Sequence, residues 1–370
     1  MKKMILGAIL SCFIMNVDLS AQCVFQSTSA ATLPHLKYYG GPVITNVKVV
    51  DVLWGPNVNV EVKENMPLFF NALITSVWID GFSEYNTVGK AYPTTNQAIG
   101  RGTFIGQFMI SPIHSNSSIT EADIQAELTA QLDSGHLPAP QYDDLGYLET
   151  IYVIEFPPNI TITANDGSVS CVDFCAFHSD MMYNGKWIMY AIHPDFSAGC
   201  ASGCGSGTLL QNQQSVHSHE LAEAITDPEV GTNTLSWYDV NKGENGDICN
   251  GLSTELVIDG VAYTVQKTWS NVKNQCLGVM PSLLSPTNFI VKVLTNSNKV
   301  THELSFDPSP SQYLNGYRIV EGGSLLATIP ASGPFVFNAL NRDPSKQYVY
   351  RLIAFNNSGI QSTFQVVTVP

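Results

Sequence analysis

The sequence has little charge, and positive charge is the scarcer kind. Only 13% of its 370 residues are charged, and 17 lysines and arginines stand against 31 aspartates and glutamates, for a formal net charge of −14. Such a chain repels phosphate groups, so we expect neither nucleic acid nor an anionic membrane as a partner. Apolar residues nevertheless make up 44% of the chain. This composition excludes a disordered protein and predicts two or more folded domains.

Long apolar runs are missing after the N-terminus, which predicts no membrane span in the remaining chain. Residues 1–21 themselves have the features of a secretory signal peptide. Lys2 and Lys3 precede an apolar stretch over 4–17, and Ser20 and Ala21 are small residues of the kind found at a cleavage site. The apolar stretch is too short for an anchor helix. The sequence therefore predicts a secreted, extracellular protein.

Cysteine is absent after Cys276, and an exported protein favours disulfides between the cysteines that precede it. Cys12 would leave with the signal peptide, and Cys23 is the natural unpaired one. We predict a Cys249–Cys276 bond and two bonds among a group of four, in an order that stays open, namely Cys171, Cys175, Cys200 and Cys204. A zinc site built from these four and His178 is the alternative, but the spacing is not the usual one.

The segment over 22–281 predicts an α+β domain with a mixed sheet and an active-site helix, the layout of a zincin. Apolar, β-branched runs predict strands over 42–54, 148–156 and 187–192. Helices are expected over 61–78, with Pro67 inside it, over 118–134, capped by Ser118 or Thr120, and over 207–226. Residues 255–266 predict a hairpin that turns at Asp259-Gly260.

A second domain is expected over 282–370, after a linker that runs from Pro281 to Pro286. Short alternating segments separated by turn residues predict an all-β, immunoglobulin-like sandwich, with strands over 288–294, 301–306, 317–321, 324–329, 347–356 and 363–369. The stretch GYRIVEGG…YVYRLIAFNNSGIQS resembles a fibronectin type III domain. The resemblance implies a spacer or an adhesive unit, without chemistry of its own.

The candidate chemistry lies in His219-Glu-Leu-Ala-Glu223, inside the expected helix 207–226. On a helix, His219, Glu223 and Asp227 follow one another by single turns on one face. An imidazole and carboxylates in this arrangement can bind a divalent cation, most naturally zinc. Glu220 stands where the general base of an HExxH metallopeptidase stands, although Glu223 replaces the second histidine.

A third metal ligand has to come from elsewhere in the chain, and Glu244 or Asp247 could supply it. Asp239, Asn241 and Asp247 also suggest calcium, although Glu244 stands where an EF-hand needs glycine. The ordinary alternative is a solvated helix face with no metal at all. The apolar neighbours of the motif argue against it, because buried carboxylates need a partner.

Two further histidines flank this motif. His217 points roughly opposite His219 on a helix, so we expect it to be structural or to support a ligand. His178 follows the cysteine pair at 171 and 175 and is either a core histidine or a catalytic proton donor near the site.

These motifs together resemble the EXORDIUM/phosphate-induced protein 1 family of plants and its bacterial relatives, over about residues 35–281. The matching stretches are Tyr38–Ile44, Leu53-Trp54, Cys171…Cys175-x2-His178, Cys200-x3-Cys204, Ser218–Glu223, Trp237-Tyr238 and Gly246–Cys249. Asp227 departs from the plant motif, which tends to have asparagine there, and the plant proteins lack the C-terminal module. The resemblance implies export and, for the plant members, wall association without an established reaction.

Two functional hypotheses therefore stand. In the first, the chain is a secreted zinc metallopeptidase that hydrolyses polypeptide through metal-activated water. His219 and Glu223 bind zinc with Glu244 or Asp247, and Glu220 is the general base. In the second, the chain is not an enzyme and binds a surface or wall polymer.

Overall fold

The computed structural model describes residues 33–197, 200, 203–230, 234–297, 299–311, 314–357 and 359–369. Within this range Pro34–Pro370 forms one compact unit. The expected signal peptide 1–21 and Cys23 lie outside the described residues. None of the helices in the described ranges is both long and apolar enough to cross a membrane.

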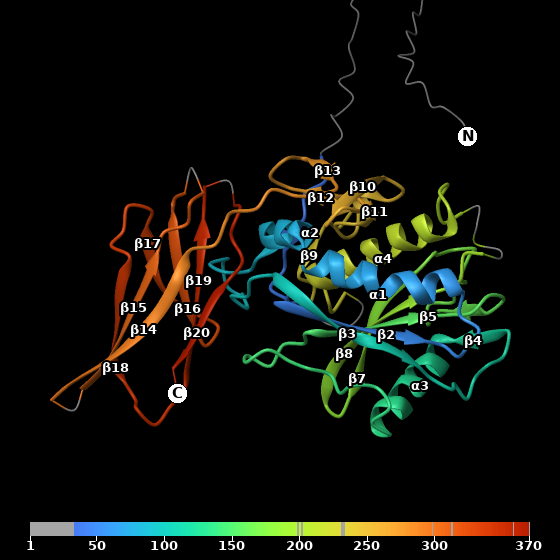
Figure 1. Ribbon diagram of the computed structural model, residues 1–370, viewed down its shortest axis with the longest axis horizontal. Helices are drawn as coiled ribbons and strands as arrows, with labels where there is room; N and C mark the ends of the chain where they lie inside the picture. The colour runs from blue at the N-terminus through green and yellow to red at the C-terminus, as the bar shows by residue number, and fades with distance from the viewer. Residues whose placement is uncertain are drawn as a thin grey trace, which may run out of the picture. The chain divides into compact units, whose positions relative to one another are not determined.

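A five-stranded mixed sheet organises the part of the chain that carries the HELAE motif (Figure 1). Its strand order is β3-β2-β5-β8-β7, from β3 (Gly100–Met109), β2 (Asn46–Leu53), β5 (Thr150–Glu155) and β8 (Lys186–His193) to β7 (Phe177–Tyr183). The first four strands run parallel, and β7 lies antiparallel to β8 at the edge. Every residue of β5 is buried, as expected of a strand covered on both faces.

Helices cover both faces of this sheet, which confirms the mixed α and β character of the domain (Figure 1). Helices α1 (Val60–Ile74) and α4 (Leu209–Thr226) pack in one apolar core with alternate sheet residues such as Val153 and Met189. Helix α3 (Glu121–Asp133) packs in a second core on the opposite face. The alternation of side chains along each strand produces the two cores.

The expected helix 61–78 ends earlier than predicted, at Ile74, and a short helix α2 (Val77–Asp80) follows. Ser76 causes the break, because its hydroxyl accepts from the Trp78 backbone N–H and donates to the Leu73 carbonyl. Pro67 is tolerated inside α1. It cannot donate to the carbonyl of Lys63, which accepts instead from the side chain of Gln107 at 2.9 Å.

Capping residues set the starts of the other two helices. Of the two caps considered for α3, the structure selects Thr120, in a reciprocal capping box with Asp123, while Ser118 lies in strand β4 (Ser118–Thr120), which pairs with β6 (Thr161–Thr163). Thr208 and Gln211 form the same box at the start of α4. Local sequence signals therefore fix where the motif-bearing helix begins.

Small sheets complete this part of the chain. The predicted hairpin is confirmed as β10 (Ser253–Ile258) and β11 (Val261–Gln266), with positive φ values of 50° and 82° at Asp259 and Gly260. Two further pairs are β1 (Lys37–Tyr38) with β9 (Trp237–Tyr238) and β12 (Thr268–Ser270) with β13 (Gln275–Leu277), and two short 3-10 helices span Gly81–Tyr85 and Asp247–Cys249.

The segment after the linker is an all-β sandwich, as predicted. One sheet has the order β14-β15-β18 and the other β17-β16-β19-β20. The strands are β14 (Thr287–Asn296), β15 (Lys299–Asp307), β16 (Gly316–Glu321), β17 (Ser324–Pro330), β18 (Val336–Arg342), β19 (Tyr348–Phe355) and β20 (Gln365–Val369). Leu304, Tyr317, Tyr350 and Leu352 are fully buried between the sheets.

Sequence patterns missed strands β3, β7 and β18 and the short strands β1, β4, β6, β9, β12 and β13. Strand β7 was missed for a physical reason: its inward positions include His178 and Asp180, both buried, so its pattern is not the apolar alternation of an ordinary strand. Strand β7 is also the missed strand that carries the candidate catalytic residue His178.

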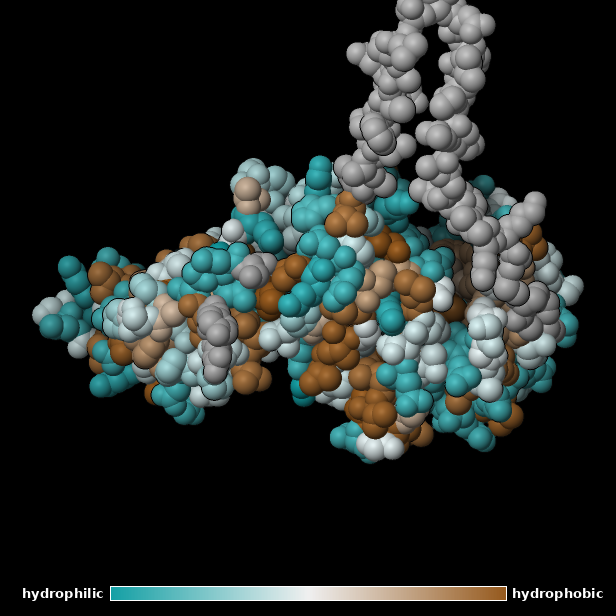
Figure 2. Space-filling view, turned by 90° about the horizontal axis from the view of Figure 1, so that it is seen from above, coloured by the Kyte–Doolittle hydropathy of each residue, from teal (hydrophilic) through white to brown (hydrophobic). Residues whose placement is uncertain are grey.

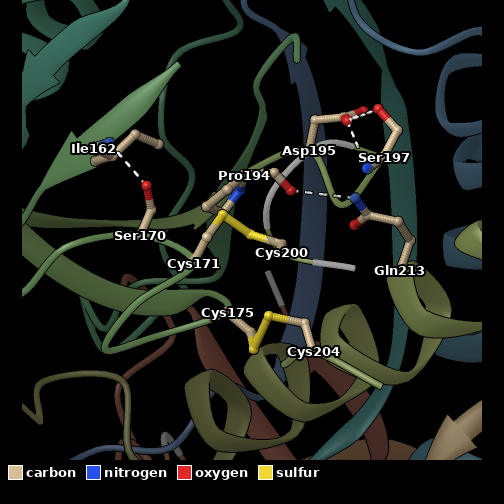
Figure 3. Close-up of a disulfide and its surroundings, with 10 residues drawn as sticks. All are labelled: Ile162, Ser170, Cys171, Cys175, Pro194, Asp195, Ser197, Cys200, Cys204 and Gln213. Carbon is tan, nitrogen blue, oxygen red and sulfur yellow. Dashed lines mark hydrogen bonds between the residues drawn. A yellow bond between two sulfur atoms is a disulfide. The ribbon is translucent and has the colours of Figure 1, made fainter. Parts of the chain in front are cut away.

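The predicted disulfides are confirmed as Cys171–Cys200, Cys175–Cys204 and Cys249–Cys276. The cysteines are therefore not a zinc site, and His178 is separate from them. Figure 3 shows the first two bonds near the start of α4, where Gln213 donates to the carbonyl of Pro194. They join the segment just before β7 to the segment just before α4, and so constrain the two elements that meet at the site described below.

The surface reflects the low charge of the sequence. Apolar areas lie between hydrophilic ones over the face shown in Figure 2. Exposed large apolar side chains include Tyr92, Ile113 and Val172. Single exposed apolar residues are ordinary for a folded protein.

Candidate metal centre

Three side chains of helix α4 lie close together, namely those of His219, Glu220 and Glu223. His219 Nε2 lies 3.1 Å from Glu223 Oε1, one turn further along the helix, and 3.9 Å from Glu220 Oε1. Both glutamates are 4% exposed, whereas the His219 side chain is 12% exposed. The motif is therefore not a solvated helix face, because two carboxylates and an imidazole are largely removed from water.

A loop from outside the helix brings Asp247 to this group, which supports it as the third ligand. Asp247 Oδ1 lies 3.9 Å from His219 Nε2, and the Asp247 backbone N–H donates to Glu223 Oε1 at 2.8 Å. The loop can come this close because residue 246 is glycine. A Cβ there would lie 2.7 Å from Glu223 Oε1 and 3.0 Å from His219 Nδ1. The Cys249–Cys276 bond anchors the same loop.

Strand β7 brings His178 to the other side of the two glutamates. His178 Nδ1 lies 3.5 Å from Glu220 Oε2 and 3.9 Å from Glu223 Oε2. Its Nε2 atom lies 3.7 Å from Glu244 Oε1 and 3.4 Å from the backbone oxygen of Asp227. His178 is 6% exposed. Of the two interpretations of His178, a core histidine or a proton donor near the site, the contacts favour the one that places it near the site.

Two of the expected acids take other positions. Glu244 lies beside His178 rather than beside His219. Asp227 lies just beyond the helix, which ends at Thr226 as predicted, and does not continue the ligand face, because it is the C-cap of α4, with φ −149°. Its Oδ1 atom accepts from the Ser236 backbone N–H at 2.7 Å. Glu223 therefore follows His219 by one helical turn, but this spacing does not extend to Asp227 because the helix has ended.

The electrostatics of the site favour a cation. Burial raises the pKa of Glu244 well above its usual value, and the nearby charge of Glu223 raises it further. Burial also raises the pKa of Glu223, against the effect of His219. Although burial opposes it, the charge of Glu223 raises the pKa of His219 to about 10. The group is thus short of positive charge, which a divalent metal supplies.

Unpartnered oxygens support the same conclusion. Glu244 Oε1 and Asp227 Oδ2 are buried without a hydrogen-bond partner, and such atoms are costly unless something else satisfies them. Two groups have donor atoms close enough to hold an ion within the described ranges, His219 with Glu223 and Asp247, and His178 with Glu220 and Glu223. The residues present fit a zinc-type metal, since nitrogen and carboxylate oxygen are its usual ligands.

Gln266 is a supporting residue that sequence reasoning missed. Its amide nitrogen lies 2.6 Å from His219 Nδ1 and donates to the Gly246 carbonyl oxygen at 3.0 Å. It thereby holds the imidazole ring against the loop that carries Asp247. Its position at the end of β11, which packs on α4, is a tertiary fact with no signal in the motif.

His217 lies on the opposite side of α4, as predicted, in a separate buried cluster. Its Nε2 atom lies 2.6 Å from Glu155 Oε1, and its Nδ1 atom lies 2.7 Å from the Gln213 carbonyl oxygen. The ring of His193 stacks on it at 3.6 Å. Burial lowers the pKa of His193 well below its usual value, and the charge of His217 adds to this effect. This cluster joins α4 to the end of β5.

The loop does not assemble the calcium ligands that the sequence suggested. Asp239 uses one oxygen to accept from the Asn241 backbone N–H and the other to accept from that of His35, both at 2.8 Å. Asp247 is directed to His219 and Glu223 instead.

Comparison with known proteins gives little guidance. No family profile and no curated protein matches the chain. A structure of OgpA from Akkermansia muciniphila in complex with an O-glycopeptide substrate is 9% identical, with 91% of this chain and 97% of that chain covered and a TM-score of 0.23. The fn3 domain of human contactin 1 is 19% identical, with 24% and 78% covered and a TM-score of 0.20.

A third similarity is to the spore cortex lytic enzyme SleM from Clostridium perfringens, at 16% identity, over 26% of this chain, with a TM-score of 0.20. The chain spans 30% of the length of that protein. The case for function therefore rests on the site itself.

Proposed function

We propose that the protein is an exported, zinc-dependent hydrolase that cleaves peptide bonds. The observation that carries this proposal is the meeting of His219 and Glu223 from α4 with Asp247 from a distant loop, all with donor atoms within 3.9 Å of His219 Nε2. Two ligands in a tetrahedral zinc site lie about 3.3 Å apart. The observed separations need only small side-chain movements to reach this value.

In this proposal the metal, when bound, polarises the scissile carbonyl and acidifies a water molecule. Glu220 accepts the proton of the attacking water and returns it to the leaving amine. Its position fits both tasks, because Glu220 Oε1 faces His219 while Oε2 faces His178 Nδ1 at 3.5 Å. His178 in turn holds Glu220 in place. It is the imidazole nearest to Glu220 and can act as a proton donor.

The edge of the central sheet supports a polypeptide as substrate. Strand β7 carries His178 and has a partner strand on one side only, β8. An edge strand can add an extended peptide through main-chain hydrogen bonds. A peptide bound along β7 passes close to His178, so its carbonyl groups come within reach of Glu220 and the metal ligands.

Export is part of the same proposal. The described residues contain three disulfides, which belong to oxidising compartments, and the N-terminal residues have the features of a signal peptide. The β-sandwich after residue 282 fits the fibronectin type III resemblance and would act as a spacer or an adhesive unit.

The test uses the exported chain, residues 22–370, supplied with zinc and offered a peptide library. We expect peptide hydrolysis and at least one zinc ion per chain by mass spectrometry. His219→Ala should abolish the hydrolysis and lose the zinc ion that His219 binds, whereas His136→Ala, which changes an exposed histidine outside the site, should change neither. Zinc-loaded protein that cleaves no peptide would contradict the proposal.

The second candidate function is that of a non-enzymatic protein that binds a surface or wall polymer, as the EXORDIUM resemblance implies. The observation that favours it is the sandwich, which has its own apolar core. Retention of zinc-free protein by insoluble wall material, undiminished in His219→Ala, would support this candidate over the first.

A further inference from the structure

The two glutamates of the motif each face two histidines. Glu220 and Glu223 direct their Oε1 atoms to His219 Nε2, at 3.9 Å and 3.1 Å. They direct their Oε2 atoms to His178 Nδ1, at 3.5 Å and 3.9 Å. A carboxylate that presents one oxygen to each of two imidazoles has the arrangement of a bridge between two metal ions, and here two carboxylates share it.

We propose that the site holds a second divalent cation, bound by His178, Glu220 and Glu223, and bridged to the first by Glu223. The proposal adds to the proposed function, on which it rests for the first ion, and makes His178 a metal ligand in place of a proton donor. The first ion takes His219, Glu223 and Asp247, the second takes the Oε2 side of both glutamates, and Glu220 keeps its Oε1 atom free to act as the general base. Donor atoms of the second set lie within 4.8 Å of one another, and all three residues are buried.

The surroundings of His178 supply an independent reason. Glu244 is 6% exposed, and its Oε1 atom has no hydrogen-bond partner although it lies 3.7 Å from His178 Nε2. A histidine that binds a metal through one nitrogen usually donates its other N–H to a carboxylate or a carbonyl. Binding through Nδ1 leaves an Nε2–H directed at Glu244 and at the Asp227 carbonyl, so the second ion accounts for a carboxylate with no other role.

The balance of charge points the same way. Five acidic side chains, Glu220, Glu223, Asp227, Glu244 and Asp247, surround two histidines in this region, and four of the five are at most 6% exposed. One divalent cation leaves several of these charges uncompensated in a buried setting, which is costly. A second cation brings the group close to neutrality. Because the two ions repel each other, the second binds more weakly than the first.

Metal stoichiometry tests the inference without any assay of hydrolysis. Metal-free exported chain is titrated with zinc chloride by calorimetry and equilibrium dialysis. We expect two zinc ions per wild-type chain, one per His178→Ala chain and one per His219→Ala chain. His136→Ala is the matched histidine control and should retain two. A wild-type chain that binds one ion, or a His178→Ala chain that still binds two, would overturn the inference.

Glu244→Gln gives a second variant in case His178→Ala fails to fold, which near-ultraviolet circular dichroism would reveal. As a positioning change it should leave the first ion unaltered and weaken the second about 10- to 100-fold. If wild type and Glu244→Gln bound the second ion with equal affinity, that result would count against the inference. Wild type that binds one ion and loses it in His219→Ala would refute the second site but leave the proposed hydrolase intact. A wild-type chain that binds two ions but hydrolyses no peptide would support the second site and refute the proposed hydrolase.

Discussion

Helix α4 separates two buried clusters of histidine and carboxylate, and the clusters differ in how many acids face each histidine. On one side, His217 has a carboxylate oxygen at 2.6 Å and a carbonyl oxygen at 2.7 Å, one for each ring nitrogen. On the other side, His178 and His219 face more acids than they can neutralise, and oxygens of Glu244 and Asp227 have no partner.

The contrast supports the proposal that one cluster is structural and that the other binds a cation. Both clusters are buried and both contain histidine, so burial and composition do not separate them. In the closed cluster, an oxygen lies within hydrogen-bond distance of each ring nitrogen of His217. In the open cluster, Glu244 Oε1 and Asp227 Oδ2 have no hydrogen-bond partner among the described residues, which supports our proposal of a bound cation. A loop reaches this cluster through Gly246 and Asp247.

The largest expected effect comes from the open cluster. Glu220→Gln removes the general base but keeps the shape of the side chain, so the rate of peptide hydrolysis should fall about 10²- to 10⁴-fold. Stability should change little. The measurement is kcat/KM together with the zinc content of the first site, which we expect to persist.

Glu127→Gln is the matched control, since Glu127 is equally buried, at 2% exposed, but lies in α3. A comparable loss of rate in that variant would mean that Glu220 has no specific role.

The next effect comes from the closed cluster. Glu155→Leu leaves the imidazole of His217 buried without its carboxylate, which should lower the free energy of unfolding by about 3–5 kcal/mol. Urea titration followed by circular dichroism measures this. We also expect the zinc affinity of folded Glu155→Leu to stay within about 3-fold of wild type, which would separate the two clusters further. Unchanged stability would show that the pair is not structural.

Gly246→Ala should have a smaller effect, on the open cluster alone. The added methyl group would lie 2.7 Å from Glu223 Oε1, so the loop that carries Asp247 must move away. We expect zinc affinity to fall about 10-fold, which corresponds to about 1.4 kcal/mol. At Gly203 the nearest atom to an added Cβ is 4.0 Å away, and Gly203→Ala serves as the control. Equal affinity in both variants would remove the packing argument for glycine.

The smallest effect concerns Asp51, beside the closed cluster. Burial raises the pKa of Asp51 well above its usual value, and the charge of Glu155 adds to this effect. The folded state thus holds this proton more tightly than the unfolded state, so stability is lost as pH rises above about 4.

Asp51→Asn cannot titrate, so it should be more stable than wild type at pH 7 and nearly equal to it at pH 4. Thermal melts of both proteins across this range measure the difference. A gain that grows toward acid pH would reverse the sign of the argument.

Sequence reasoning went furthest where the signals are local. The helix expected over 207–226 is observed as α4, and the spacing of His219 and Glu223 follows from helical geometry. Prediction failed where distant parts meet. Strand β7 was missed because buried polar residues interrupt its apolar pattern, and Gln266 carries no motif that would connect it to His219.

The amino-acid sequence by itself determined the helix that carries HELAE, the Cys249–Cys276 bond, the group of four cysteines that pair among themselves and the sandwich at the end of the chain. These follow from short-range periodicity, turn chemistry and redox context. Only the tertiary structure decided that Asp247 approaches His219, that Glu244 approaches His178, and that Asp227 ends the helix instead of extending its ligand face. The reason is physical: helical periodicity relates residues about one turn apart, whereas long-range convergence depends on packing against a sheet whose strands are far apart in the chain.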